Sequence, residues 1–596
     1  MMRRLASLSG LLLLPVFVTA RSIQPAGAPP LPLDEIRPGM PGEVWTVFRG
    51  TEPEPFSVEV AGIVRSAFGP GRHLILCRLI DPKVKDIGPA AGMSGSPLYI
   101  SGRLAGALSY QLQRFETVPH AGFTPVEDLL AVGRLAPAPA PGGAASIPSP
   151  PGEPEPVPDP GAPGPLAAQG APTFVPLTPV FSLSGLDPAV VSLFAPRLQA
   201  LGISAAGTGG SVSGAPAAAA PRLQAGGCVC AALAIGDITI AGTGTVARID
   251  GDQVLAFGHP LMRLGAVEFP MAAAEVVTIL PSQMSSTKVT NVGPVIGTIT
   301  QDRLSAISGR LGPGPAMIPV NVDVRTRDGS RHLVFSVVRQ PQLTPMIAAL
   351  GLAQAILGSN DAGLAEGFRV HREIAFPGGR TVAADNVYAG PSGFTLGIGE
   401  LLRDLGECLQ NPFAKVWPAR LSFRVEALDH SPLAILDNVQ LSRTTAAPGE
   451  TVQITLSWRD YRDARSFQTV DIPVDRRWAG KSLDVVVVNG PLLDEITGKP
   501  RLVPAAQIRS FEEYLSLLAA GRRTDGLYIA VVEPAHLLID QTKPVLEWPA
   551  SVERIARGAD ERRFERRDAM ASLWEQHCLP ERVITGGIRR PLRVTD

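Results

Sequence analysis

A short stretch in the N-terminal quarter of the chain combines the residue types that catalysis by a serine nucleophile requires. Residues 92–97 read Gly-Met-Ser-Gly-Ser-Pro, and two β-type runs joined by a Ser-Gly turn follow them. Glycine lets the backbone bend sharply, so the amides of Gly92 and Ser94 could point at one position and form an oxyanion hole. The pattern predicts Ser94 as a nucleophile. Its simpler interpretation is a hairpin loop without activity.

A serine hydroxyl is a weak nucleophile and needs a base beside it. The chain has eight histidines, and His259 stands out because it ends the apolar run Leu-Ala-Phe-Gly-His. The glycine before it would present the imidazole at the end of a strand. His120, in Val-Pro-His-Ala-Gly, is nearer to Ser94 in the sequence. We favour His259 as the base, although a lone histidine is more often structural than catalytic.

Two of the five cysteines, Cys228 and Cys230, lie two residues apart in an apolar stretch. On a strand they would face the same side, where they could take part in a metal or redox site. Small buried residues are the more economical interpretation. The odd number of widely spaced cysteines does not indicate a disulfide framework. We therefore predict no metal and no organic cofactor.

Length and composition limit the class of protein. The chain has 596 residues, 45% hydrophobic and 18% charged, with a net charge of −1. This length predicts about three to five domains with sizeable cores. The absence of a basic excess argues against a nucleic-acid partner.

The first twenty residues have the pattern of an export signal. Met-Met-Arg-Arg is a positive start, residues 5–18 are largely apolar, and Val-Thr-Ala at 18–20 offers small residues for cleavage. We expect a signal peptide over 1–20 and a location in the periplasm, the cell envelope or outside the cell. The alternative is an uncleaved anchor, for which the apolar run is short.

The elements that must position the candidate residues are mainly β. Residues 34–135 alternate short β-type runs with turns and would carry Ser94, and residues 228–345 do the same and would carry His259. Between them, 136–227 combines a Pro/Ala/Gly-rich stretch with a second low-complexity patch, which predicts a linker and an insertion.

The C-terminal half adds further units. Residues 346–416 predict an apolar helix and connecting strands. The period-two pattern of Thr-Val-Gln-Ile-Thr-Leu-Ser-Trp at 451–458 predicts an immunoglobulin-like β-sandwich over 417–490. Residues 491–596 predict a small α/β region, with a helix beginning near Ser510.

Several separate stretches resemble the SpoIVB-type serine peptidases, sporulation signalling proteases of chymotrypsin-like fold. Asp81-Pro82 precedes the serine hexapeptide, and the run 244–250 precedes Ala-Phe-Gly-His at 256–259. Ile-Gly-Thr-Ile at 296–299 and Ser-Gly-Arg-Leu-Gly at 308–312 are also similar to the family. The resemblance covers roughly residues 36–135 and 228–340.

This resemblance implies a catalytic triad of Ser94 as nucleophile, His259 as base and Asp81 as acid, with the amides of Gly92 and Ser94 as the oxyanion hole. Asp81 is the weakest of these assignments, because an aspartate before proline is often only a turn residue. Asp302, in Thr-Gln-Asp-Arg, is a competitor at a suitable distance after His259. The family's histidine segment precedes its serine segment, whereas here the serine segment comes first, as in a circular permutation.

We therefore expect a permuted, chymotrypsin-like double β-barrel, followed by an immunoglobulin-like sandwich and a small α/β region. The resemblance implies an exported serine endopeptidase that works through an acyl-enzyme, in regulatory cleavage or self-cleavage. Its substrates would be proteins or peptides, membrane-associated ones among them. The alternative is a catalytically silent cell-envelope scaffold or binding protein that keeps the peptidase fold.

Overall fold

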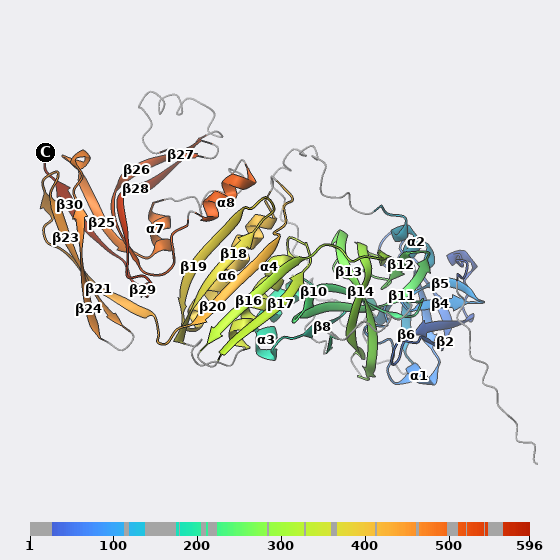
Figure 1. Cartoon of the computed structure of the whole chain (residues 1–596). Coiled ribbons are helices and arrows are strands. Elements are labelled where there is room, and N and C mark those ends of the chain that lie inside the picture. The colour runs from blue at the N-terminus through green and yellow to red at the C-terminus, as the bar shows by residue number, and fades with distance from the viewer. Residues whose placement is uncertain are drawn as a thin grey trace, which may run out of the picture.

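The computed structural model is mainly β and arranges the chain as units in a row, with the N-terminal barrels at one end and a C-terminal sandwich at the other (Figure 1). It describes residues 27–596 except 113–117, 137–173, 178, 204–209, 212–222, 283–284, 327–328, 359–365, 412–413, 461–463, 498–509, 520, 541–542 and 546–563. The expected signal peptide and most of the expected linker therefore lie outside the described residues.

The first unit is a closed barrel of six antiparallel strands. Around the ring the order is β1-β2-β3-β6-β5-β4, and β4 pairs again with β1. We call it the serine barrel, because Ser94 lies between β3 and β4. Its elements are η1 Leu33–Glu35, β1 Pro41–Thr46, β2 Glu54–Val64, β3 Leu74–Leu79, α1 Pro82–Lys85, β4 Pro97–Ile100, β5 Arg103–Leu112, β6 His120–Pro125 and α2 Val126–Gly133.

The second unit closes in the same way. Its ring order is β10-β11-β12-β15-β14-β13, and β13 pairs again with β10, all antiparallel. In both barrels the first strand is followed by the second, third, sixth, fifth and fourth. We call this unit the histidine barrel. Its strands are β10 Cys228–Gly236, β11 Thr239–Asp250, β12 Gln253–Ala256, β13 Gly265–Leu280, β14 Thr287–Arg303 and β15 Ala306–Leu311.

The segment between the barrels contains more structure than the sequence predicted. Residues 174–200 fall within the expected linker and insertion, yet the structure places strands and a helix there: β7 Phe174–Pro176, β8 Val180–Ser184 and α3 Pro188–Ala200, followed by β9 Gly210–Ser211. β7 pairs with β5 of the serine barrel, and β8 pairs with β11 of the histidine barrel. These short strands pair with the parts of β5 and β11 that extend beyond their pairing with β4 and β12 in the rings. Local composition does not reveal such a pairing partner.

The histidine barrel ends earlier than the expected boundary at residue 345, because β16 and β17 belong to the next unit. This middle unit is the sheet β19-β18-β20-β16-β17, which continues from β10. Helices α4 and α6 lie together along the sheet (Figure 1). Its elements are β16 Ile318–Thr326, β17 Gly329–Val337, α4 Leu343–Leu357, β18 Gly367–Ala375, β19 Thr381–Ala389, α6 Gly390–Leu409 and β20 Arg420–Ala427.

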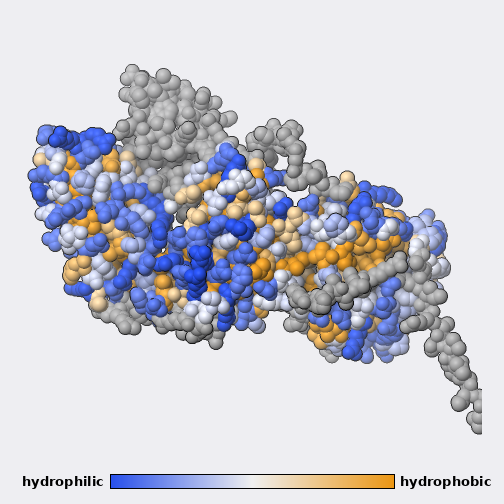
Figure 2. Space-filling model, in the orientation of Figure 1, coloured by the Kyte–Doolittle hydropathy of each residue, from blue (hydrophilic) through white to orange (hydrophobic). Residues whose placement is uncertain are grey.

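The surface of the middle unit is strongly hydrophilic where β18, β19 and β20 lie, whereas hydrophobic surface is visible over the histidine barrel (Figure 2). Five polar or charged side chains on these neighbouring strands line a shallow pocket on this surface: Arg369, His371, Asp385, Arg424 and Glu426. Helix α4 is buried along almost its whole length. The sheet therefore has one apolar face under the helices and one charged face.

The C-terminal unit is a sandwich of two sheets, β24-β23-β21-β29 and β22-β30-β25-β26-β27, with β28 beside β26. One apolar core joins the two sheets. Its elements are β21 Leu433–Leu441, β22 Thr445–Ala446, β23 Thr451–Asp460, β24 Arg465–Pro473, η2 Arg476–Trp478, β25 Ser482–Val488, α7 Gly490–Ile496, β26 Leu527–Asp540, β27 Lys543–Val545, β28 Phe564–Cys578, β29 Val583–Thr585 and β30 Ile588–Val594. Helix α8 Phe511–Ala519 packs instead against α6 and β19 of the middle unit.

The expected boundaries of the C-terminal domains were wrong in two respects. β20, within the expected sandwich 417–490, pairs instead with β16 and β18 of the middle sheet. The strands between 527 and 594, which were expected in a separate α/β region, complete the sandwich. Both differences arise because strand pairing over long sequence distances is not encoded in local periodicity. Among the described helices, none is long and apolar enough to cross a membrane.

Candidate active site

Ser94 and His259 occupy equivalent places in the two barrels. Ser94 lies in the connection between the third and fourth strands of the serine barrel, and His259 lies in the same connection of the histidine barrel. The shared strand order therefore brings two corresponding connections to the junction between the barrels. Both residues are completely buried there.

Hydrogen bonds tie each connection to the opposite barrel. The Thr245 amide of the histidine barrel donates to the Ser94 carbonyl at 2.7 Å. In the opposite direction, Thr124 Oγ1 of the serine barrel donates to the Gly258 carbonyl at 2.7 Å. The approach is so close that a Cβ on Gly95 would lie 1.9 Å from the Thr245 oxygen. The nucleophile turn and the Gly-His segment thus form one packed unit.

The turn around Ser94 has the backbone that an oxyanion hole needs. Gly92 and Gly95 have φ values of 90° and 97°, in the left-handed region that glycine tolerates. The amides of Met93 and Ser96 hold the turn through bonds to Ala90 and Met93 carbonyls. Within the described part of the chain, the amides of Gly92 and Ser94 donate to no other group. These two amides therefore have no acceptor within the described part of the protein, and both residues are buried.

The imidazole of His259 has the protonation state of a general base. Its Nδ1 lies 2.7 Å from the Pro260 carbonyl oxygen, and since a carbonyl only accepts, Nδ1 carries the hydrogen. Nε2 therefore presents a lone pair. Burial lowers the pKa of His259 to about 4, against the weaker opposite effect of the Pro260 bond. The ring is consequently neutral at pH 7.

Two polar atoms at this junction have no hydrogen-bond partner among the described residues: Ser94 Oγ and His259 Nε2. They are therefore not hydrogen-bonded to each other in this structure. Buried polar atoms are rarely left unpaired, and each such exception asks for an explanation. Catalytic hydrogen bonds are often long before substrate binds, so this geometry is compatible with a serine–histidine pair.

The residue before the Gly-His pair has a strained backbone. Phe257 is fully buried and has a φ of 70°, in a region that bulky residues rarely adopt. Its ring lies against Gly244, where a Cβ would be only 2.0 Å from it. Strain of this kind persists only where the surroundings enforce it, and it is frequent at functional sites.

The two candidate acids have different partners in the structure. Asp81 is the N-cap of α1, where its carboxylate accepts from the amides of Lys83 at 2.9 Å and Ser57 at 3.1 Å. No contact between Asp81 and His259 occurs among the described residues. The expected role of Asp81 as the orienting acid therefore has no support in this geometry. Proline after Asp81 favours a helix start, which explains the Asp-Pro pair locally.

Asp302, at the end of the fifth strand of the histidine barrel, holds the segment that follows His259. Its carboxylate accepts from the amides of Leu261 at 2.7 Å, Met262 at 2.9 Å and Leu264 at 3.1 Å. Burial raises the pKa of Asp302 above its ordinary value, and these amides oppose that effect. Asp302 thus positions the His259 connection through its backbone, without a bond to the imidazole.

A buried lysine that the sequence did not indicate is linked through Thr245 to the turn of Ser94. Lys288 Nζ donates to Thr46 Oγ1 at 2.8 Å and to Thr245 Oγ1 at 3.4 Å, and Thr245 Oγ1 donates to the Gly92 carbonyl at 3.0 Å. Burial lowers the pKa of Lys288 to about 8. A single lysine in an alternating strand is the only signal for it in the sequence. The structure adds a cation close to the proposed oxyanion hole.

Two other candidates from the sequence have no support from the structure. Cys228 and Cys230 are buried and unpaired thiols, and burial raises the pKa of both, which disfavours thiolate chemistry. No group of three or more metal-ligating side chains occurs in the part of the chain that the structure describes. His120 lies on β6, where its Nδ1 contacts the Val118 carbonyl.

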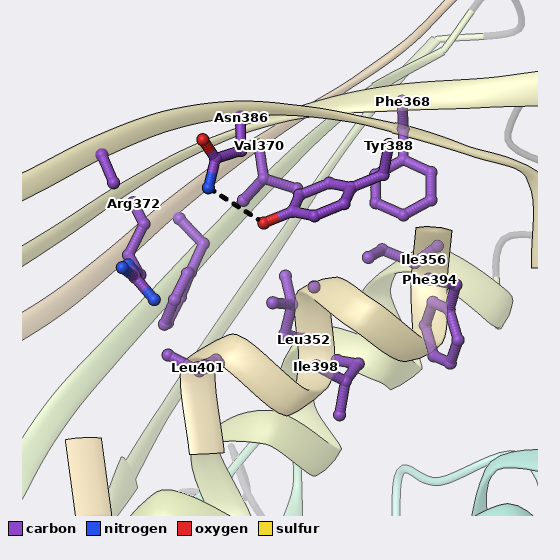
Figure 3. A pocket seen from close by; sticks show the side chains of 13 residues that line it. Leu352, Ile356, Phe368, Val370, Arg372, Asn386, Tyr388, Phe394, Ile398 and Leu401 are labelled. Carbon is purple, nitrogen blue, oxygen red and sulfur yellow. Dashed lines mark hydrogen bonds between the residues drawn. The ribbon is translucent and has the colours of Figure 1, made fainter. Parts of the chain in front are cut away.

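A separate cavity lies in the middle unit, between α4, α6 and the sheet (Figure 3). Its lining is mostly apolar, with a polar end where Tyr388 donates to Glu400 at 2.7 Å and Arg372 pairs with Asp404 at 2.6 Å. The free volume is about 20 Å³, enough for about one water. It is too small for an organic substrate, and a water would satisfy the unpaired Arg372 Nε.

Searches of protein-family models, of curated proteins and of solved structures found no match to this chain. The candidate site is therefore defined by its own geometry. Two barrels of one strand order place a serine, a histidine and two unoccupied amides at a shared junction.

Proposed function

We propose that this chain is a serine endopeptidase of the SpoIVB type, with Ser94 as nucleophile and His259 as general base. The observation that carries the proposal is the pair of buried, unpartnered atoms Ser94 Oγ and His259 Nε2 on two connections that are each hydrogen-bonded to the opposite barrel. Two β-barrels that meet at these connections are also what the resemblance to chymotrypsin-like peptidases implies.

The proposed chemistry follows the usual triad logic. His259 Nε2 takes the proton of Ser94 as Oγ attacks the carbonyl carbon of a peptide bond, and the amides of Gly92 and Ser94 stabilise the oxyanion. The imidazolium then gives its proton to the leaving amine, and water hydrolyses the acyl-enzyme. Asp302 is the positioning residue of the His259 connection, in place of Asp81.

The expected export stays part of the proposal. An exported peptidase would meet protein substrates in the cell envelope, and the apolar start of the chain supports this location. If the signal is cleaved as proposed, N-terminal sequencing of the protein from its host should begin at Arg21. A retained Met1 would instead support the anchor.

The competing proposal is a silent scaffold of the cell envelope that keeps the fold without turnover. The complete burial of Ser94 and His259, and the absence of a bond between them, favour it. Active and silent proteins differ in the reactivity of Ser94, not in the fold. The decisive measurement is therefore chemical reactivity at this one hydroxyl.

A fluorophosphonate probe measures that reactivity. We expect covalent labelling that maps to Ser94 by mass spectrometry and is lost in Ser94→Ala and in His259→Ala. His120→Ala is the matched control and should label like the native chain. A Ser94→Cys variant reports access separately: if its thiol reacts with a maleimide while native Ser94 stays unlabelled, the site is reachable but unreactive and the scaffold is the better proposal.

A further inference from the structure

The segment 174–184 crosses the junction between the two barrels beside the candidate site. β7 extends the serine barrel by pairing with β5, and β8 extends the histidine barrel by pairing with β11. We call the part from Phe174 to Leu177 the strap. It follows the Pro/Ala/Gly-rich stretch 136–171 in the sequence.

The strap is held as an extended peptide along β5. Its antiparallel register places Val175 opposite Gln111 and Pro176 opposite Tyr110, and the Leu177 amide donates to the Ser109 carbonyl at 2.8 Å. In such a ladder, hydrogen-bonded pairs alternate with non-bonded pairs, so Pro176 falls where its missing N–H costs nothing. Peptide ligands that add a strand to a sheet edge bind in the same manner.

The point at which the strap ends is adjacent to the Gly-His segment. Ser109, which accepts from Leu177, has its hydroxyl 2.8 Å from Thr124 Oγ1, the group that donates to Gly258. A Cβ on Gly258 would lie 2.5 Å from Ser109 Oγ. One strand residue, Ser109, therefore binds the strap through its carbonyl and contacts the residue before His259 through its hydroxyl.

Leu177 is completely buried and lies close to the turn of Ser94. Ser109, which binds its amide, follows Leu108, whose carbonyl accepts from the Gly95 amide at 2.7 Å. Leu177 also belongs to the apolar cluster of the serine barrel that includes Ala90 and Met93, which flank the turn. An aliphatic side chain therefore suits this position.

The segment after the strap covers the other side of the histidine connection. Phe181 of β8 lies opposite Gly242, and a Cβ at Gly242 would contact both Phe181 at 3.2 Å and Leu261 at 2.6 Å. Leu261 follows His259 by two residues. The chain between the barrels thus binds Ser109, which lies beside Gly258, and packs near Leu261, so it borders the His259 connection.

We propose that the strap occupies the peptide-binding groove of the candidate site in the manner of a substrate, with Leu177 in the pocket that selects the substrate side chain. This inference rests on the proposed function. The groove then accepts an extended peptide that pairs antiparallel with β5 and carries an aliphatic residue in the place of Leu177. A substrate must displace the strap, so the chain as described is an occluded enzyme whose Ser94 reacts with a fluorophosphonate only while the strap is transiently detached, and therefore slowly.

Thiol accessibility tests the occlusion without requiring catalysis. In a Ser94→Cys background, maleimide labelling is compared among the otherwise native chain, Leu177→Asp and the control Leu193→Asp, whose leucine on α3 is exposed. The five native cysteines are buried and give a low background. An aspartate cannot remain in the apolar pocket, so we expect labelling in Leu177→Asp to be faster by about tenfold or more.

A second variant distinguishes displacement of the strap from loss of the fold. Val175→Pro removes the amide that would donate to Gln111 in the bonded pair and leaves the barrel core unchanged, so it should also accelerate labelling. Circular dichroism confirms the fold of each variant. Equal labelling rates in native, Leu177→Asp and Val175→Pro chains would overturn the occlusion.

The assignment of the groove is tested in the Leu177→Asp chain with Ser94 intact. A peptide aldehyde of the strap sequence Thr-Phe-Val-Pro-Leu should slow fluorophosphonate labelling, whereas the same peptide ending in Asp should not. Equal effects of the two peptides would refute the substrate-like binding. Fast thiol labelling combined with an inert Ser94 would refute the proposed function while the occlusion held.

Discussion

Replacing either candidate acid by its amide, Asp302→Asn or Asp81→Asn, separates the two carboxylates that the sequence left in competition. Asp302 accepts three backbone bonds from the segment after His259, two of them on one oxygen. An asparagine keeps one acceptor oxygen and turns an NH₂ group toward the remaining amides. An asparagine whose oxygen takes the place of the doubly bonded oxygen keeps the Met262 and Leu264 bonds without their charge, loses the bond from Leu261 and sets its NH₂ group against that amide.

The magnitude follows from the lost bond. A hydrogen bond to a charged group is worth about 1.5–3 kcal/mol, so the ordered His259 connection loses about 1.5–3 kcal/mol. At about 1.4 kcal/mol per factor of ten, the ordered population falls by roughly 10–100-fold. Asp81→Asn is the matched control, because asparagine caps a helix nearly as well as aspartate and the change costs about 1 kcal/mol or less.

The assay is the rate of fluorophosphonate labelling of Ser94, measured beside the thermal unfolding of each variant. We expect Asp302→Asn to slow labelling by at least about tenfold and Asp81→Asn by less than about fivefold. Thermal unfolding separates a local effect from global loss of the fold. Slow labelling in Asp81→Asn with normal labelling in Asp302→Asn would refute this reasoning and restore the acid role of Asp81.

Two further predictions follow from the same junction. Because burial holds the pKa of His259 at about 4, below its unfolded value of 6.5, the ring is neutral and able to act as a base at pH 5–8. The rate of fluorophosphonate labelling should be constant over that range and fall only near pH 4. The contribution of His259 to the free energy of unfolding should be fully present above pH 6.5 and decline toward pH 4. A midpoint of the labelling rate near pH 6.5 would contradict the burial of the ring. Gly95→Ala would place a Cβ 1.9 Å from the Thr245 oxygen and should cost more than about 3 kcal/mol in urea unfolding, whereas Gly102→Ala, with open space around it, should cost about 1 kcal/mol; equal losses would argue against close docking of the barrels.

The residues with strong local signals were predictable. Ser94 lies in a hexapeptide whose glycines are required by its positive φ angles, and His259 follows an apolar strand and a glycine. The placement of both residues in turns at strand ends could therefore be predicted from a few neighbouring residues. The mainly β class was also predictable, because alternation and turn residues are local properties. The closed rings were less so, since closure depends on pairings such as β1 with β4 over long sequence distances.

The residues that the sequence did not reveal depend on partners elsewhere in the chain. The strap is a strand only because β5 offers it an edge, and its own composition resembles the linker before it. Lys288 becomes notable only when the barrels bury it. The sequence left the role of Asp81 ambiguous, because an aspartate before proline can be either a helix cap or a catalytic acid. Only the bonds of Asp81 to Ser57 and Lys83 indicate the helix cap.

The order of the barrels along the chain has a consequence for how the protein is made. The serine barrel is complete at residue 125, whereas the histidine barrel is complete only at residue 311. A ribosome adds about 5–20 residues per second, so the nascent chain carries the proposed nucleophile for roughly tens of seconds before the barrel of the proposed base can fold. On the proposed assignment, the growing polypeptide cannot attack itself or its neighbours during that interval. The strap emerges within the same interval, ahead of the histidine barrel, and can line the groove before the site first becomes competent.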